Sequence, residues 1–375
     1  MPDLAGSIQR RLQPARNCCI VVTVYSAKRV SGKTYSVHFW SLFSSTVGVT
    51  VSSASITTRP HASVSQDTPI VRRVDHLVIR VAESAYRQLF SMFAGALQLP
   101  SHRRATQRSA YTGGSVYAGN VDFRLLPAPA GVFDTAAQFY GLVLETQSQD
   151  LSRLSARGIP YIPAPYLMPQ PGQEPALLRV NVFLGGYLGA TPSMRALFAL
   201  NKLVPDSVWM RTLAREAPDR IQGAKFMVNH VYRDGMVFLV KYNPGWRATD
   251  AERRRSIADF IARRGGSLGL ISVKEVVIGT TNLMSAYARW HKLLYPADET
   301  DQGCWQLGDG PAIRLIAAEQ DAIHHLVWEV ESLAEAYQVL GDMGLLGRVL
   351  DEEIRIKRDM MGGLDIRLVE VGITA

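Results

Sequence analysis

The stretch His324–Gly344, HHLVWEVESLAEAYQVLGDMG, predicts a half-buried strand followed by a short amphipathic helix that ends at a glycine. The same order of signals occurs at Val74–Leu97, at Gly141–Gly158 and at Val273–Leu294. Four strand-then-helix units in one chain form an internal repeat. Such a repeat indicates an architecture assembled from copies of one supersecondary unit.

Length and composition indicate a globular protein with room for two domains. The chain has 375 residues, of which 47% are hydrophobic and 20% charged. It contains no run of roughly 20 apolar residues, so no membrane span is expected. Cys18 and Cys19 are adjacent and Cys304 is distant, which gives neither a disulfide framework nor a CxxC site and favours a reducing compartment.

The net charge of +8 is concentrated at the N-terminus. Residues 1–73 hold nine Lys or Arg and two acids, so the other 302 residues carry only about +1. The folded part therefore lacks the charge expected of a nucleic-acid-binding protein. The Ser/Thr-rich, acid-poor tail has the composition of a mitochondrial transit peptide, and a disordered tail of a cytoplasmic protein or a start codon assigned too far upstream are equal alternatives.

The repeat divides the rest of the chain into two domains. A Pro-rich run, Pro160–Pro175, predicts a surface loop, and a capping box at Thr249–Glu252 opens a connecting helix. The predicted segments are a tail at 1–73, a first domain at 74–245 with a helical insertion at 185–220, a connecting helix at 246–269, and a second domain at 270–375.

The units resemble the vicinal-oxygen-chelate superfamily, which includes glyoxalase I, extradiol dioxygenases and bleomycin-resistance proteins. The resemblance spans about residues 74–372 and is closest to the glyoxalase-like branch. It implies an α+β fold of tandem βαβββ modules paired into two curved-sheet, glyoxalase-like domains. It is carried by VDHLVIRV at 74–81, IHHLVWEVESLAEA at 323–336, and the glycine-preceded strands GNVDFRLLP, GPAIRLIA and GGLDIRLVE.

In metal-binding members of this superfamily, the opening strand of a module supplies a His, Gln or Glu, and the closing strand supplies a Glu. By this resemblance His76, Glu275 and His325 are the candidate metal ligands, whereas Gly141 stands at the corresponding position of the second module. The metal would be Zn, Fe, Mn or Ni, held with open positions for a substrate that chelates through two oxygens.

The closing strands depart from the superfamily pattern. They carry Arg124, Arg314 and Arg367 where a glutamate is expected, and a guanidinium cannot bind a cation. If these side chains face inward, they would bind a carboxylate or a phosphate; if they face outward, they have only a structural role. Trp328 is expected in the core or in a cavity wall, and we group it with the arginines as a candidate substrate-binding residue.

Three functions follow from the resemblance and from these departures. The first is an enzyme of lyase, isomerase or dioxygenase type that polarises a small substrate with one divalent metal. The second is a metal-free protein that binds or sequesters a small molecule in an anion-accepting cavity, and the third is a structural or interaction protein that has kept the fold and lost the site. Because His324 alternates with His325, we expect it on the opposite face of the strand. Either a monomer or a homodimer is compatible with four modules.

Overall fold

The computed structural model describes residues 69–372, apart from 109–110, 129–134, 148–150, 171–172, 201–233, 244–247 and scattered positions between 190 and 200. Of the N-terminal segment it describes only a hairpin, β1 (Tyr25–Arg29) paired with β2 (Gly32–Ser36). This segment and the chain from residue 64 form separate units. The predicted transit-like tail and most of the predicted insertion at 185–220 lie outside the described residues.

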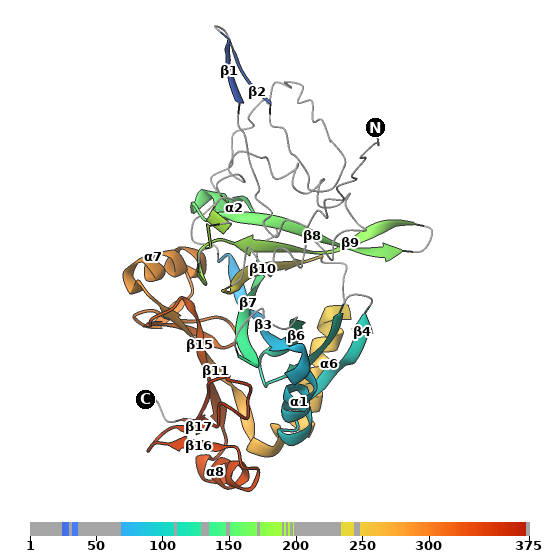
Figure 1. Ribbon diagram of the computed structural model, residues 1–375, viewed down its shortest axis with the longest axis vertical. Helices are drawn as coiled ribbons and strands as arrows, with labels where there is room; N and C mark the ends of the chain where they lie inside the picture. The colour runs from blue at the N-terminus through green and yellow to red at the C-terminus, as the bar shows by residue number, and fades with distance from the viewer. Residues whose placement is uncertain are drawn as a thin grey trace, which may run out of the picture. The chain divides into compact units, whose positions relative to one another are not determined.

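From residue 69 onward the chain repeats one βαβββ module four times (Figure 1). The first module contains β3 (Val71–Ala82), η1 (Glu83–Ala85), α1 (Tyr86–Ser91), η2 (Met92–Ala96), β4 (Ser101–Arg108), β5 (Tyr111–Tyr117) and β6 (Asp122–Ala128). The second contains β7 (Ala137–Thr146), α2 (Ser152–Ala156), β8 (Tyr161–Gln170), β9 (Gln173–Leu184) and β10 (Met236–Tyr242).

After the connecting helix α6 (Ala248–Ala262) and the turn η4 (Gly266–Leu268), the pattern restarts. The third module contains β11 (Leu270–Thr280), α7 (Leu283–Leu294), β12 (Asp298–Asp301), β13 (Cys304–Gln306) and β14 (Ala312–Ala317). The fourth contains β15 (Ala322–Val330), α8 (Leu333–Asp342), β16 (Leu346–Val349), β17 (Ile354–Ile356) and β18 (Ile366–Glu370).

Modules pair in chain order to form two eight-stranded sheets. Their strand orders are β4-β5-β6-β3-β7-β10-β9-β8 and β12-β13-β14-β11-β15-β18-β17-β16. Within each module the first strand lies parallel to the last, and two modules join through their antiparallel first strands, β3 with β7 and β11 with β15. The predicted α+β fold of paired βαβββ modules is confirmed.

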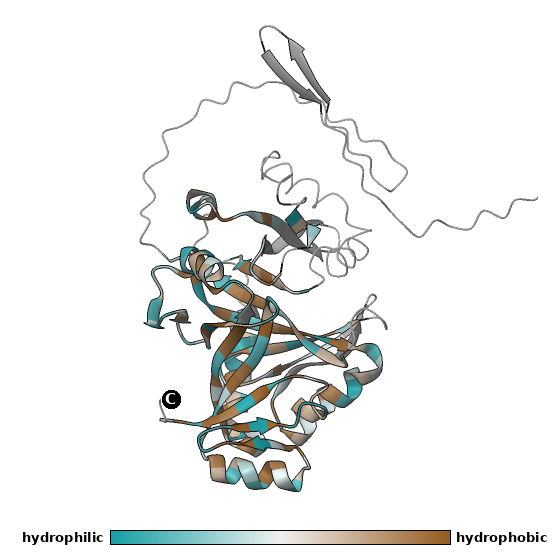
Figure 2. Ribbon diagram, turned by 60° about the vertical axis from the view of Figure 1, so that its left-hand side comes forward, coloured by the Kyte–Doolittle hydropathy of each residue, from teal (hydrophilic) through white to brown (hydrophobic). Residues whose placement is uncertain are grey.

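Local sequence explains the strand-then-helix boundary of the fourth module. Residues on β15 alternate between buried and more exposed positions after His325, as a strand with one face on a core requires. Along the described strands, hydrophobic and hydrophilic residues are interspersed (Figure 2). Ser332 caps α8 by accepting a hydrogen bond from the Glu335 backbone N–H at 3.3 Å. The helix is followed by Gly344, whose φ of 68° is accessible to glycine at little cost.

The prediction of a surface loop for the Pro-rich run Pro160–Pro175 was wrong. This segment forms β8 and the start of β9. Because β8 is the outermost strand of its sheet and pairs only with β9, its prolines need no partner on the free side. Pro163 lies opposite Val182 and Pro165 opposite Val180 in this edge pairing.

One apolar core joins the two sheets. The Trp328 ring from β15 stacks on the Phe123 ring from β6, with centroids 5.9 Å apart and an interplanar angle of 25°. Phe93 packs against both rings, at 5.9 Å from Phe123 and 6.5 Å from Trp328. All three side chains are fully buried, so Trp328 is a core residue that connects the halves.

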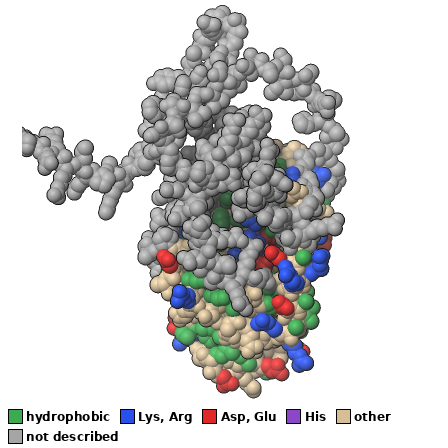
Figure 3. Space-filling model, turned by 90° about the vertical axis from the view of Figure 1, so that its right-hand side faces the viewer, with side chains coloured by type: hydrophobic (Ala, Val, Ile, Leu, Met, Phe, Trp, Pro, Cys, Tyr) green, Lys and Arg blue, Asp and Glu red, His purple; other side chains and the backbone are tan. Residues whose placement is uncertain are grey.

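The surface agrees with the near-neutral charge of the folded part. On the face that Figure 3 shows, acidic and basic side chains are interspersed among the described residues without a basic stripe. No helix in the described ranges has the length and hydropathy needed to cross a membrane.

Replacing Trp328 by Ala should lower the free energy of unfolding by about 3–5 kcal/mol, because the change leaves a cavity in the core that both sheets share. Urea unfolding followed by far-UV circular dichroism should show one transition at a lower midpoint. Tyr337→Ala removes an exposed aromatic ring and serves as the control. Loss of structure in the second half alone, with the first half intact, would contradict a shared core.

Candidate functional site

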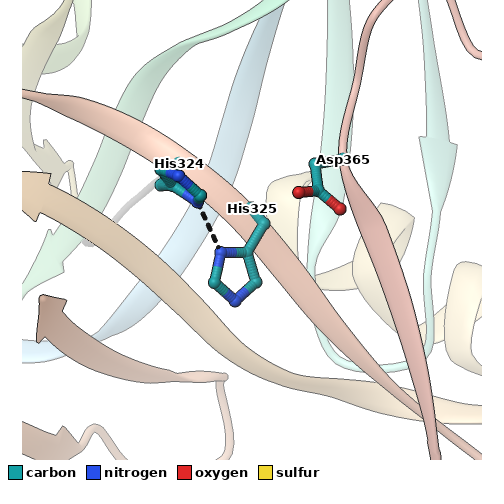
Figure 4. Close-up of side chains that lie close together, drawn as sticks. All are labelled: His324, His325 and Asp365. Atoms are coloured by element: carbon teal, nitrogen blue, oxygen red, sulfur yellow. Dashed lines mark hydrogen bonds between the residues drawn. The ribbon is translucent and has the colours of Figure 1, made fainter. Parts of the chain in front are cut away.

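A β-bulge brings two adjacent histidines to the same side of β15. His325 lies opposite Val277 of β11, and Ile323 lies opposite the next residue, Ile278, so His324 is an extra residue in the pairing. The two imidazole Nδ1 atoms are 2.8 Å apart and share a hydrogen bond, in which one ring donates and the other accepts (Figure 4). The expectation that His324 faces away from His325 was therefore wrong.

Asp365 completes the cluster from the neighbouring strand. It immediately precedes β18, and its backbone carbonyl accepts a hydrogen bond from the Leu326 backbone N–H at 3.1 Å, which fixes it beside His325. Its side chain is buried, and Oδ1 has no hydrogen-bond partner. Oδ2 accepts a long hydrogen bond of 3.4 Å from Arg367. The carboxylate thus retains an acceptor that nothing in the described chain satisfies.

These three side chains fit a divalent cation. One potential ligand atom from each of His324, His325 and Asp365 lies within 4.8 Å of the other two. Ligands bonded to an ion at about 2.1 Å stand roughly 3–4 Å from one another, so small side-chain adjustments suffice. Two imidazoles and one carboxylate are ligands that Zn, Fe, Mn and Ni all accept.

Burial keeps one of the imidazoles neutral. Desolvation, followed by the positive charge of Arg367, lowers the pKa of His325 to about 3. A neutral imidazole offers a lone pair at physiological pH, which is the form that binds a metal.

The cluster opens into a cavity of about 1030 Å³ between the two halves of the chain. Arg80 and Gln138 line it from the first sheet, and residues 317–324, Arg358 and the loop 363–365 line it from the second. His324 and Asp365 belong to this lining, whereas His325 stands behind them. A small molecule in the cavity would reach the cluster directly.

The structure does not bring Glu275 into this cluster. Its carboxylate binds Arg314 in a forked arrangement, with Nε to Oε2 and Nη2 to Oε1 both at 2.7 Å. Arg314 also pairs with Asp301 at 3.2 Å. The predicted half-site of Glu275 and His325 therefore has its carboxylate engaged by a guanidinium.

The other predicted residues lie in three different places. Arg367 pairs with Glu353 at 3.5 Å and with Asp365, next to the histidine cluster. Trp328 lies in the core described above. His76 lies in the first half, where its Nδ1 bonds the Asp75 carboxylate at 2.5 Å. Arg124 lies on β6, where the Tyr242 phenol and the Asp75 carboxylate act on its charge.

Sequence reasoning missed His324 and Asp365. The pair His324-His325 was visible, but strict alternation separates adjacent side chains, and a bulge breaks that rule without a signal in the sequence. Asp365 was not a candidate, and its place immediately before the closing strand is the only signal that could have indicated it.

The fold and the site together define a protein of paired βαβββ modules with a His-His-Asp cluster at a cavity between its halves. Its fold is similar to that of the 2,3-dioxygenase LapB from Pseudomonas sp. KL28, at 12% identity and a TM-score of 0.45, covering 81% of this chain and 93% of that one. The Mn(II)-bound glyoxalase from Novosphingobium aromaticivorans is 9% identical, with a TM-score of 0.45 and coverages of 81% and 83%.

A third similar structure is homoprotocatechuate 2,3-dioxygenase from Arthrobacter globiformis, at 10% identity and a TM-score of 0.46, covering 82% of each chain. No family model matches this sequence, and no curated protein matches it either. At these identities the likeness concerns the fold alone.

His76 should make the stability of the protein sensitive to acid. Burial, and then the charge of Arg124, lower its pKa from the ordinary 6.5 to about 4. The unfolded chain therefore takes up a proton between these values that the folded protein does not. This contribution to stability is complete above pH 6.5 and is lost as the pH falls toward 4.

Compared with the wild type, His76→Gln should lose less unfolding free energy between about pH 7 and about pH 5, because its amide does not titrate. Urea unfolding at both pH values measures the difference, and His291→Gln, which removes a half-exposed histidine of α7, is the control. An identical pH dependence in wild type and His76→Gln would contradict the buried, neutral state of His76.

Proposed function

We propose that this protein is a metal-dependent enzyme for a small, oxygen-bearing substrate. His324, His325 and Asp365 would hold one divalent ion, and the substrate would enter the cavity between the two halves. The observation that carries this proposal is a buried carboxylate oxygen, without a hydrogen-bond partner among the described residues, that lies close to two imidazoles at the wall of a large cavity.

Each residue of the cluster has a defined task in this proposal. His325 and Asp365 are buried and fixed by strand pairing, so they provide a rigid base for the ion. His324 is more exposed than the other two residues and lines the cavity. It would therefore bring the ion within reach of a substrate.

The cavity wall provides polar groups that would orient a substrate. The Arg80 Nη2 donates to the Gln138 Oε1 at 2.8 Å, and the guanidinium carbon lies 4.4 Å from the centre of the Tyr140 ring. Both contacts hold Arg80 at a fixed position. A bound divalent ion would supply Lewis-acid polarisation of substrate oxygens, which is compatible with lyase, isomerase or dioxygenase chemistry.

Purified without chelators, the full-length protein should contain about one equivalent of Zn, Fe, Mn or Ni per chain. Asp365→Asn and His324→Gln should each bind the ion at least about tenfold more weakly, since each removes one of three ligands. Metal analysis and titration with Co(II), followed by its visible absorption, measure content and affinity.

Glu275→Gln is the matched control, because it removes a carboxylate of the same sheet that is engaged by Arg314. It should leave the metal content unchanged. Loss of metal in Glu275→Gln with retention in Asp365→Asn would transfer the centre to the site predicted from the sequence. Absence of metal from all of these proteins would favour the alternative, a metal-free binding protein.

Arg367→Met should tighten binding of the divalent ion by about tenfold. The guanidinium stands 3.4 Å from Asp365 Oδ2 and repels a cation at the cluster. Two unit charges about 4 Å apart interact by about 1–4 kcal/mol, depending on the effective dielectric constant, which exceeds the value of one long hydrogen bond. The Co(II) titration measures this change, with Arg314→Met as the control. Weaker binding in Arg367→Met would show that the guanidinium is needed to orient Asp365.

A further inference from the structure

The two halves of the chain carry an arginine at equivalent positions. Arg124 on β6 lies opposite Val78 of β3, and Arg314 on β14 lies opposite Val277 of β11. Two residues before these valines stand His76 in the first half and Glu275 in the second, each directly after a bulge in its strand. Residues two apart on a strand share a face, so His76 and Glu275 occupy the same place relative to the two arginines.

In the second half the chain satisfies this arginine itself. Glu275 binds Arg314 through two parallel hydrogen bonds of 2.7 Å, the forked geometry in which a guanidinium and a carboxylate match best. Glu275 is largely buried, which strengthens the pair.

In the first half an imidazole replaces this carboxylate. Among the described residues, no ion pair joins Arg124 to a carboxylate, and the groups that act on its charge are the Tyr242 phenol and the Asp75 and Asp122 carboxylates. The Asp75 carboxylate is engaged elsewhere, since Oδ2 lies 2.5 Å from His76 Nδ1 and accepts a bond of 3.1 Å from the Tyr242 hydroxyl. Within the described residues, Arg124 thus lacks the forked carboxylate partner that its counterpart Arg314 has.

The His76 ring is held in one orientation and one tautomer. The bulge at Asp75 places two adjacent side chains on the same side of β3, and the Asp75 carboxylate accepts a hydrogen bond from the Nδ1–H of His76. Nε2 therefore carries the lone pair and accepts a hydrogen bond. Phe238 packs edge-on against the ring at 6.1 Å, and the imidazole is only 2% exposed.

We propose that the first half binds a small 2-hydroxycarboxylate. Its carboxylate would bind Arg124 as the Glu275 carboxylate binds Arg314, and its hydroxyl would donate to Nε2 of His76. This site is separate from the His324, His325 and Asp365 cluster and needs no metal.

Calorimetric titration of the full-length protein in the presence of a chelator tests this site without the metal centre. Glycolate should bind with a stoichiometry of one, and acetate, which lacks the hydroxyl, should bind at least about fivefold more weakly. Arg124→Met should weaken glycolate binding by at least about tenfold. Arg314→Met, the same change at the equivalent position of the other half, should leave it unchanged.

Exchanging the two partner residues gives a second, independent test. His76→Glu places a carboxylate beside Arg124, as in the second half, and should abolish glycolate binding while the protein remains folded by circular dichroism. Glu275→His should create a second glycolate site at Arg314, raising the stoichiometry to two. Absence of glycolate binding in the wild type, or unchanged binding in His76→Glu, would overturn the proposal.

Discussion

Both sheets depend on one contact, the antiparallel pairing of the opening strands of two modules. β3 pairs with β7 and β11 with β15, and all other strands extend outward from these central pairs. Each pairing contains an extra residue at equivalent points, Tyr140 on β7 and His324 on β15. An irregularity at the centre of a sheet persists only when the surrounding strands stabilise it, and here it turns adjacent side chains to one side. The candidate metal cluster is a direct consequence.

The repeat also explains why this cluster occurs in only one described half. In the first half, Gly141 on β7 pairs with Met236 on β10. The equivalent positions of the second half are His325 on β15 and Asp365, which immediately precedes β18. A Cβ atom at Gly141 would lie 3.1 Å from the Val78 Cβ and 3.2 Å from the Met236 side chain, so a larger side chain there would require both neighbours to shift. The two halves therefore kept the same backbone and diverged in the side chains that face each other across the central strands.

The sequence predicted the modules because their signals are local: alternation in β15, the cap at Ser332 and the terminal glycine all lie within one stretch. The sequence-based prediction failed where the structure of a segment depends on the strands that lie next to it. Pro163 and Pro165 form a strand because β8 lies at an edge, which no local pattern reveals. Likewise, the superfamily resemblance indicated Glu275 as a ligand, while its actual neighbour, Arg314, comes from a strand 39 residues away. The charge partner of a buried group is a property of the register between strands.

The arginines that replace the expected glutamates differ in how well the chain balances their charge. Arg314 has a short, forked carboxylate partner, whereas Arg367 divides its bonds between Glu353 at 3.5 Å and Asp365 at 3.4 Å. Both of these contacts are long, and whereas Glu353 also has a short ion pair with Arg355 at 2.8 Å, Asp365 has no second cationic partner among the described residues. A buried acceptor left without a partner costs about 1–3 kcal/mol, and Asp365 Oδ1 is such an acceptor. A cation bound there would offset this cost, so in the proposed function metal binding would stabilise the second half.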